Sequence, residues 1–82
     1  MKLTDTQRNV LAAGAAVAVN GEFMARFIAD HWDKEWEARS IAGTLRGLVG
    51  LGLVERRGRG KWSWFAVTDA GRLALQGAEH DQ

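Results

Sequence analysis

Side chains that could bind nucleic acid occur in two groups along this chain. One group is a run of cations within six residues, Arg56, Arg57, Arg59 and Lys61. The other group is spread over a segment with helical spacing and contains Arg39, Ser40, Gly43, Thr44 and Arg46. Arginine can donate two parallel hydrogen bonds to paired acceptors such as those of guanine or phosphate. These residue types therefore predict recognition of a polyanion and its bases, and not the making or breaking of bonds.

Residues that would support catalysis or metal binding are sparse. The chain has no cysteine, so it has neither a disulfide framework nor a thiolate metal site. His31 lies near Asp30, Asp33 and Glu35, but one histidine beside loosely spaced carboxylates defines no coordination geometry. Gly58-Arg59-Gly60 joins two strands, whereas a phosphate-binding loop joins a strand to a helix. We expect no enzymatic activity, no metal and no cofactor.

Length and charge limit the possible organisation. Eighty-two residues make one domain with a marginal core. We predict a folded domain over residues 1–77 and a frayed tail over residues 78–82. The formal net charge is only +1, so the argument for a polyanionic partner depends on where the charges lie. They are segregated, since acidic residues gather in 30–37 and basic residues in 56–61.

The first helix is marked by a capping box and a turn. Thr4 and Gln7 have the spacing of a Thr-x-x-Gln box, which predicts a helix start near Asp5. Asn20-Gly21, whose residues both tolerate positive φ, predicts the turn that ends the helix. The inward stripe consists of Val10, Leu11, Gly14, Val17 and Ala18. Because the apolar run 10–19 is too short to span a bilayer, we interpret it as a buried helix and expect no membrane partner. The absence of cysteine fits a cytoplasmic protein.

Two more helices are predicted before the basic run. One begins at Ala25 and lasts about two turns, and the other runs from Trp36 or Glu37 to Leu51, with Gly52 as its left-handed end. The apolar face of the longer helix consists of Ala38, Ile41, Ala42, Leu45, Leu48 and Val49. Its opposite face contains three glycines, each of which costs about 1 kcal/mol relative to alanine in a helix. That cost indicates close approach either by DNA or by another helix.

A β-hairpin and a last helix complete the expected order. Strands are predicted over 53–57 and 62–67, and Phe65 and Val67 are expected to face inward. Glu22-Phe23 could add a short first strand to this hairpin. Thr68 can then cap a helix from Asp69 to about Gln76, in which Leu73 and Leu75 are available for docking.

Several short motifs between residues 3 and 75 carry a family resemblance: Leu3-Thr4, Gln7, Val10-Leu11, Ile41, Leu45, Leu48, Gly52-Leu53-Val54 and Phe65 to Arg72. In order and spacing they resemble the winged helix-turn-helix regulators of the MarR and PadR type. The resemblance implies an α+β fold, a single domain with three helices, a β-hairpin wing and a short C-terminal helix. It also implies a recognition helix over about 37–51 for the major groove and a wing over 56–61 for the backbone or minor groove.

The chain departs from this pattern in its recognition helix. MarR-type helices often place Ser-Arg where this chain has Ala42-Gly43. Base readout would then depend mainly on four side chains, Arg39, Ser40, Thr44 and Arg46. We expect modest sequence specificity.

Four tryptophans leave a second interpretation open. Trp32, Trp36, Trp62 and Trp64 could all fill the small core. If Trp62 and Trp64 are exposed, they would instead mark a partner surface. The arginines of 56–61 could also simply keep an edge hairpin soluble. The alternative function is a winged-helix protein-interaction module, for example a phage-encoded inhibitor or an assembly adaptor, that uses the tryptophans and the acidic segment.

Taken together, the residues favour a non-enzymatic DNA-binding module. We predict a small transcriptional regulator of prokaryotic or phage type whose partner is double-stranded DNA. A homodimer and a protein partner are both left open by the sequence.

Overall fold

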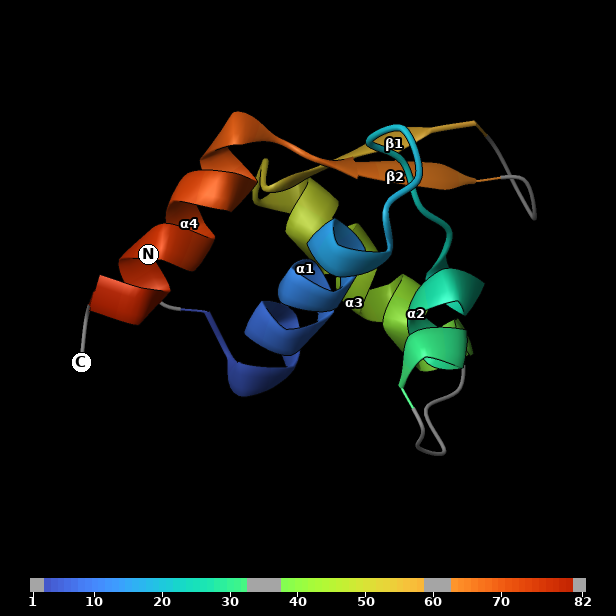
Figure 1. Cartoon of the computed structure of the whole chain (residues 1–82), viewed down its shortest axis with the longest axis horizontal. Helices are drawn as coiled ribbons and strands as arrows, with labels where there is room; N and C mark the ends of the chain where they lie inside the picture. Colours follow the sequence, from blue (N-terminus) through green and yellow to red (C-terminus); the bar gives the residue numbers. More distant parts are fainter. Residues whose placement is uncertain (1–2, 33–37, 59–62, 81–82) are drawn as a thin grey trace.

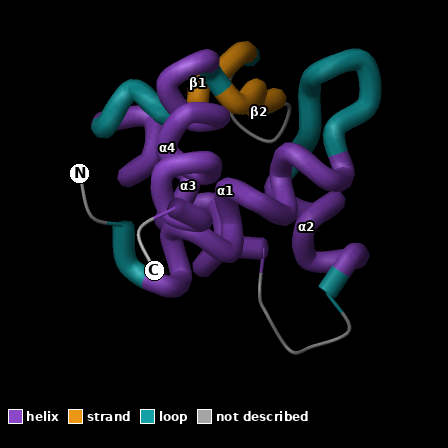
Figure 2. The backbone as a smooth tube through the Cα atoms, turned by 60° about the vertical axis from the view of Figure 1, so that its left-hand side comes forward, coloured by secondary structure: helices purple, strands orange, loops and turns teal. Residues whose placement is uncertain are grey.

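The fold combines a group of three helices with a two-stranded hairpin and a last helix (Figure 1). The computed structural model describes residues 3–32, 38–58 and 63–80. Its elements are α1 (Asp5–Val17), α2 (Ala25–His31), α3 (Ala38–Gly50), β1 (Val54–Arg57), β2 (Trp64–Val67) and α4 (Asp69–His80). Figures 1 and 2 show α1, α2 and α3 on one side of the hairpin. This order confirms the predicted winged-helix fold.

Helix α1 begins as its capping box predicts. The Gln7 amide donates to Thr4 Oγ1 and the Thr4 amide donates to Gln7 Oε1, each at 3.0 Å. The helix ends at Val17, before the turn that was expected to end it. Asn20 and Gly21 do have positive φ, 54° and 82°. Their turn instead closes a small loop in which Val19 and Glu22 exchange backbone hydrogen bonds of 2.7 and 3.1 Å.

The expected short first strand is reduced to one bridge. Phe23 and Phe65 exchange two backbone hydrogen bonds, each of 2.8 Å, in an antiparallel bridge. Both side chains are buried, and their ring centroids lie 6.0 Å apart. The segment between α1 and α2 is therefore attached to β2.

Helix α3 ends in the left-handed residue that the sequence predicts. Gly52 has φ 78°, and two hydrogen bonds of 3.0 Å close the end, from the Gly52 amide to Val49 O and from the Leu53 amide to Leu48 O. This is the Schellman pattern, with Leu48 and Leu53 in the accompanying apolar contact position and both buried. The predicted start at residues 36–37 lies outside the described residues.

The core is apolar throughout the part of the chain that the structure describes. The fully buried side chains are Phe23, Leu11, Ile28, Ile41, Leu45, Leu48, Val10 and Val54. No buried polar or charged residue is found among the described residues. The predicted alternation in β2 is only partly right, because Phe65 and Ala66 are both buried while Val67 is half-buried. None of the helices in the described part combines the length and apolar character needed to cross a membrane.

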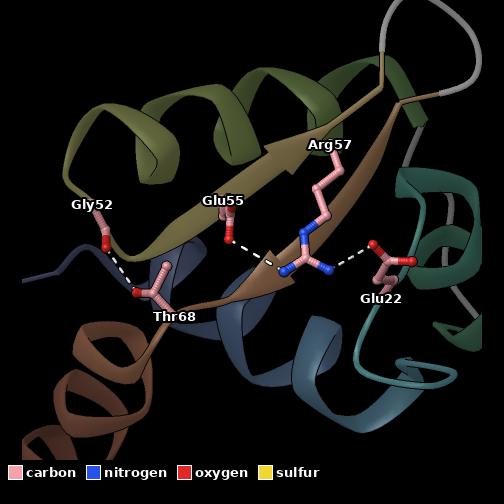
Figure 3. A network of polar contacts seen from close by, with 5 residues as sticks. All are labelled: Glu22, Gly52, Glu55, Arg57 and Thr68. Carbon is pink, nitrogen blue, oxygen red and sulfur yellow. Dashed lines mark hydrogen bonds and ion pairs between the residues drawn. The ribbon is translucent and has the colours of Figure 1, made fainter.

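Helix α4 is joined to the end of α3 through Thr68. The Gly71 amide donates to Thr68 Oγ1 at 3.0 Å, which confirms the predicted cap, and Thr68 Oγ1 donates to Gly52 O at 2.8 Å (Figure 3). The helix continues to His80, beyond the predicted end near Gln76. The division between a domain over 1–77 and a tail over 78–82 stays a prediction. Leu75 packs against the core, whereas Leu73 is exposed.

Gly71 is required where α4 meets the end of α3. A Cβ at this position would lie closer than 3.0 Å to Leu53 O and to Val67 Cγ1. We therefore expect Gly71→Ala to lower the free energy of unfolding by about 1–3 kcal/mol, as overpacking does. Urea unfolding followed by circular dichroism measures this. A variant as stable as the wild type would contradict the close approach of α4 to Leu53.

Candidate nucleic-acid interface

The exposed face of α3 is polar and small, as the sequence predicts. Buried Ile41, Leu45 and Leu48 fix which face of the helix points inward. The exposed residues are Ser40, Gly43, Arg46, Gly47 and Gly50. The helix contains no aspartate or glutamate. Because the core determines its orientation, the helix presents outward a surface without a carboxylate.

The three glycines of α3 do not serve packing within the described part of the chain. A Cβ built at Gly43, Gly47 or Gly50 would meet no atom within 4 Å beyond the helix itself and its neighbours. Of the two explanations for these glycines, tight packing against another of the described helices therefore finds no support. Gly14 shows the contrast, since a Cβ there would lie closer than 3.0 Å to the Phe23 ring.

The polar side chains of α3 differ in their exposure and in whether they already form hydrogen bonds or ion pairs. Thr44 is half-buried and its hydroxyl donates to Ser40 O at 3.2 Å. Its hydrogen is thus used within the helix, although its oxygen can still accept. Arg46 is exposed and forms no ion pair with the residues that the structure describes. Arg39 lies in the first turn of α3, and its side chain is outside the described part.

The wing is an antiparallel hairpin whose described arginines already have partners. Its register pairs Val54 with Val67 and Arg57 with Trp64. Arg56 donates to Ser63 Oγ at 2.9 Å. Three residues predicted for this site, Arg59, Lys61 and Trp62, lie outside the described residues.

Arg57 lies between two carboxylates. Its guanidinium donates to Glu22 at 2.8 Å and to Glu55 at 3.4 Å (Figure 3). The hydrogen bond to Glu22 and the charge of Glu55 raise the pKa of Arg57 above its ordinary value. Sequence reasoning missed Glu22 as a partner of the wing, because it is 35 positions from Arg57. Its place in the expected first strand, Glu22-Phe23, was the signal that could have suggested the contact.

Trp64 packs within the protein. Its ring meets the Phe27 ring edge-on, with centroids 5.6 Å apart and an interplanar angle of 84°. This contact connects β2 to α2. Trp64 is half-buried, so part of its side chain is still exposed to solvent. Trp32 is also half-buried and packs against the core. Trp36, like Trp62, is outside the described residues, so the partner-surface interpretation of the tryptophans stays a prediction.

The acidic segment and its lone histidine are only partly described. Asp30 and His31 are both exposed, and Asp33 and Glu35 lie outside the described residues. Among the residues that are described, no group of three or more histidine, aspartate and glutamate side chains could hold a metal ion.

Comparison with known proteins relates this chain to others through structure. No protein-family model matches the sequence, and no curated protein matches it either. BpsR of Bordetella bronchiseptica, whose DNA binding is regulated by 6-hydroxynicotinic acid, matches with a TM-score of 0.76 and 20% identity over 95% of this chain. The match covers 53% of BpsR, so this chain spans about half of that protein's length.

Two TubR proteins match over most of their length. TubR of Bacillus megaterium pBM400 is 27% identical, with a TM-score of 0.72 over 96% of this chain and 89% of TubR. TubR of Bacillus thuringiensis serovar israelensis, bound to 24 bp of tubC, is 15% identical, with a TM-score of 0.69 over 95% of this chain and 83% of TubR. The chain thus shares its winged-helix fold with DNA-binding proteins, while the narrower MarR or PadR assignment stays a prediction.

The open space around Gly47 makes a specific prediction for stability. In Gly47→Ala the added methyl group meets no neighbour, so the variant should gain about 1 kcal/mol from its higher helix propensity. Urea unfolding compares it with the wild type and with Gly71→Ala, which carries the same chemical change at a crowded position. A loss of stability in Gly47→Ala would mean that this face of α3 is packed.

Proposed function

We propose that this chain is a non-enzymatic DNA-binding module of a small prokaryotic or phage-type transcriptional regulator, acting in the cytoplasm. In this proposal α3 enters the major groove and the hairpin wing lies on the backbone or minor groove. The observation that carries the proposal is the exposed face of α3, which the core holds outward. This face contains Ser40, three glycines in open space, and Arg46 without an ion pair to any described residue. The fold shared with DNA-bound TubR supports it.

The glycines have a physical role in this proposal. An α-helix fits into the major groove of B-DNA, and side chains on the facing surface set how near its axis can come to the bases. Glycine at 43, 47 and 50 removes those side chains over two turns of helix. The helix could then lie deep enough for the short Ser40 hydroxyl to reach a base edge or a phosphate.

Base readout would depend on few side chains. Arg46 can bind the paired acceptors of guanine, and such a contact contributes about 1–3 kcal/mol of discrimination. Ser40 and Arg39 would add contacts, and Thr44 can act as an acceptor. With so few readers, much of the affinity would come from phosphate contacts by Arg56, Arg59 and Lys61, which carry no sequence information.

The first test is direct binding to DNA. Fluorescence anisotropy of a labelled random-sequence duplex, titrated at about 50 and 200 mM salt, should show binding that weakens steeply with salt. A slope of log K against log salt near −4 is expected if about four to five phosphates are neutralised. Absence of binding at the lower salt would contradict the proposal. A salt-insensitive protein complex lost in Trp64→Ala would then favour the interaction module.

Two variants test whether α3 is the surface that reads the bases. We expect Arg46→Ala to weaken binding to a selected duplex by about 1–3 kcal/mol and to relax its base preference. Gly47→Ala should bind less tightly than the wild type although it is the more stable protein, because its methyl group holds the helix away from the groove. Competition between selected and random duplexes measures both effects.

Either of two results would contradict this assignment of α3. One is an equal loss of affinity on every duplex for Arg46→Ala, which would make Arg46 a phosphate contact. The other is wild-type affinity in Gly47→Ala, which would mean that the glycine face does not approach DNA.

A further inference from the structure

We propose that Arg57 is a positioning residue, which attaches the wing to the turn before α2 through Glu22 and does not itself bind DNA. The proposal rests on the DNA-binding function proposed above. It removes Arg57 from the group of wing cations that the sequence assigns to phosphate, and it adds Glu22 as a residue that DNA binding depends on.

The surroundings of Arg57 make it a poor phosphate ligand. Both terminal nitrogens of the guanidinium are engaged, one with Glu22 at 2.8 Å and the other with Glu55 at 3.4 Å. One positive charge therefore faces two negative charges. A phosphate that approached the remaining N–H groups of this guanidinium would be repelled by both carboxylates.

The sheet register explains why these three residues meet. Phe23 pairs with Phe65 in an antiparallel bridge, so Glu22 lies level with Ala66, the residue after Phe65. Ala66 pairs in turn with Glu55. In this register Glu22 and Glu55 thus occupy the positions on either side of Ala66. Arg57 lies two positions beyond Glu55 on the same face of β1, and its guanidinium reaches across β2 between the carboxylates (Figure 3).

The contact between Arg57 and Glu22 joins β1 to the turn before α2, and these two segments have no other polar connection among the described residues. β1 hydrogen-bonds to β2, and β2 is attached to the turn before α2 by the Phe23 bridge. The ion pair between Arg57 and Glu22 connects β1 itself to that turn. It therefore restrains the tilt of the hairpin relative to α2. Since α2 packs on α3, it also restrains the wing relative to the proposed recognition helix.

A charge exchange separates positioning from direct contact. Arg57→Glu and Glu22→Arg each break the ion pair, whereas the double variant restores it with the charges exchanged. In the double variant a guanidinium at position 22 would again face two carboxylates, at positions 55 and 57. The net charge of the double variant equals that of the wild type. The Arg57 and Glu22 side chains are 52% and 33% exposed, so each variant should fold, with a melting temperature within about 4–8 °C of the wild type.

Amide hydrogen exchange on the DNA-free protein gives the first readout. We expect faster exchange of the Phe23 and Phe65 amides in both single variants and wild-type rates in the double variant. Arg72→Ala is the matched control, because Arg72 is an exposed arginine whose carboxylate partner, Asp69, lies in α4. Unchanged exchange in the single variants, or changed exchange in Arg72→Ala to the same extent, would overturn the positioning role.

Anisotropy titrations against salt give the second readout. We expect the single Arg57→Glu variant to bind DNA less tightly and the double variant to regain the affinity and salt slope of the wild type. Arg56→Ala is the reference for a lost phosphate contact, with a slope smaller in magnitude by about 1. The double variant could instead show wild-type amide exchange together with the reduced DNA affinity and salt slope of Arg56→Ala. That result would overturn the proposal, because Arg57 would then bind phosphate. The variants could show the expected hydrogen exchange while the wild-type protein binds no DNA. That result would contradict the proposed function but would still support the attachment of the wing by Arg57.

Discussion

The corner formed by Gly52 and Leu53 is where α3, the β-hairpin and α4 of this small domain are joined. Gly52 takes the left-handed conformation that ends α3, and Leu53 places its side chain in the core and its backbone at the start of β1. The Leu53 carbonyl accepts from the Thr68 amide at 3.1 Å, and the Gly52 carbonyl accepts from the Thr68 hydroxyl. Gly71 then lets α4 approach the same carbonyl of Leu53. The end of α3, the base of the wing and the start of α4 are thus held together by backbone groups and the Thr68 hydroxyl.

This corner also explains why the outward face of α3 can be so poor in side chains. The helix is held by its buried face and by its capped end, so its exposed glycines need not contribute to the fold. In a helix interior only proline is less favourable than glycine. A domain of 82 residues is also only marginally stable. A sequence that places glycine at 43, 47 and 50, where alanine would fit, favours close approach over stability. That choice is understandable if the face must meet another macromolecule closely.

Local signals predicted most of the fold because the residues that form them are near one another in sequence. The capping box of Thr4 and Gln7 and the left-handed Gly52 each involve a few consecutive residues, and both are found as predicted. The partners of the wing could not be predicted in this way. Glu22 meets Arg57, and Phe27 meets Trp64, only after the chain has folded. Counting arginines therefore did not show that Arg57 is already paired with Glu22 and Glu55.

We propose above all that the exposed face of α3 is the surface that contacts DNA. An amide chemical-shift titration of the protein with duplex DNA tests it most directly, since Ser40, Gly43 and Gly47 each provide a backbone amide on that face. We expect these amides to shift most and those of α4 around Leu73 to shift little. Shifts concentrated on α4, with the α3 amides unchanged, would contradict this proposal and would place the binding surface on α4.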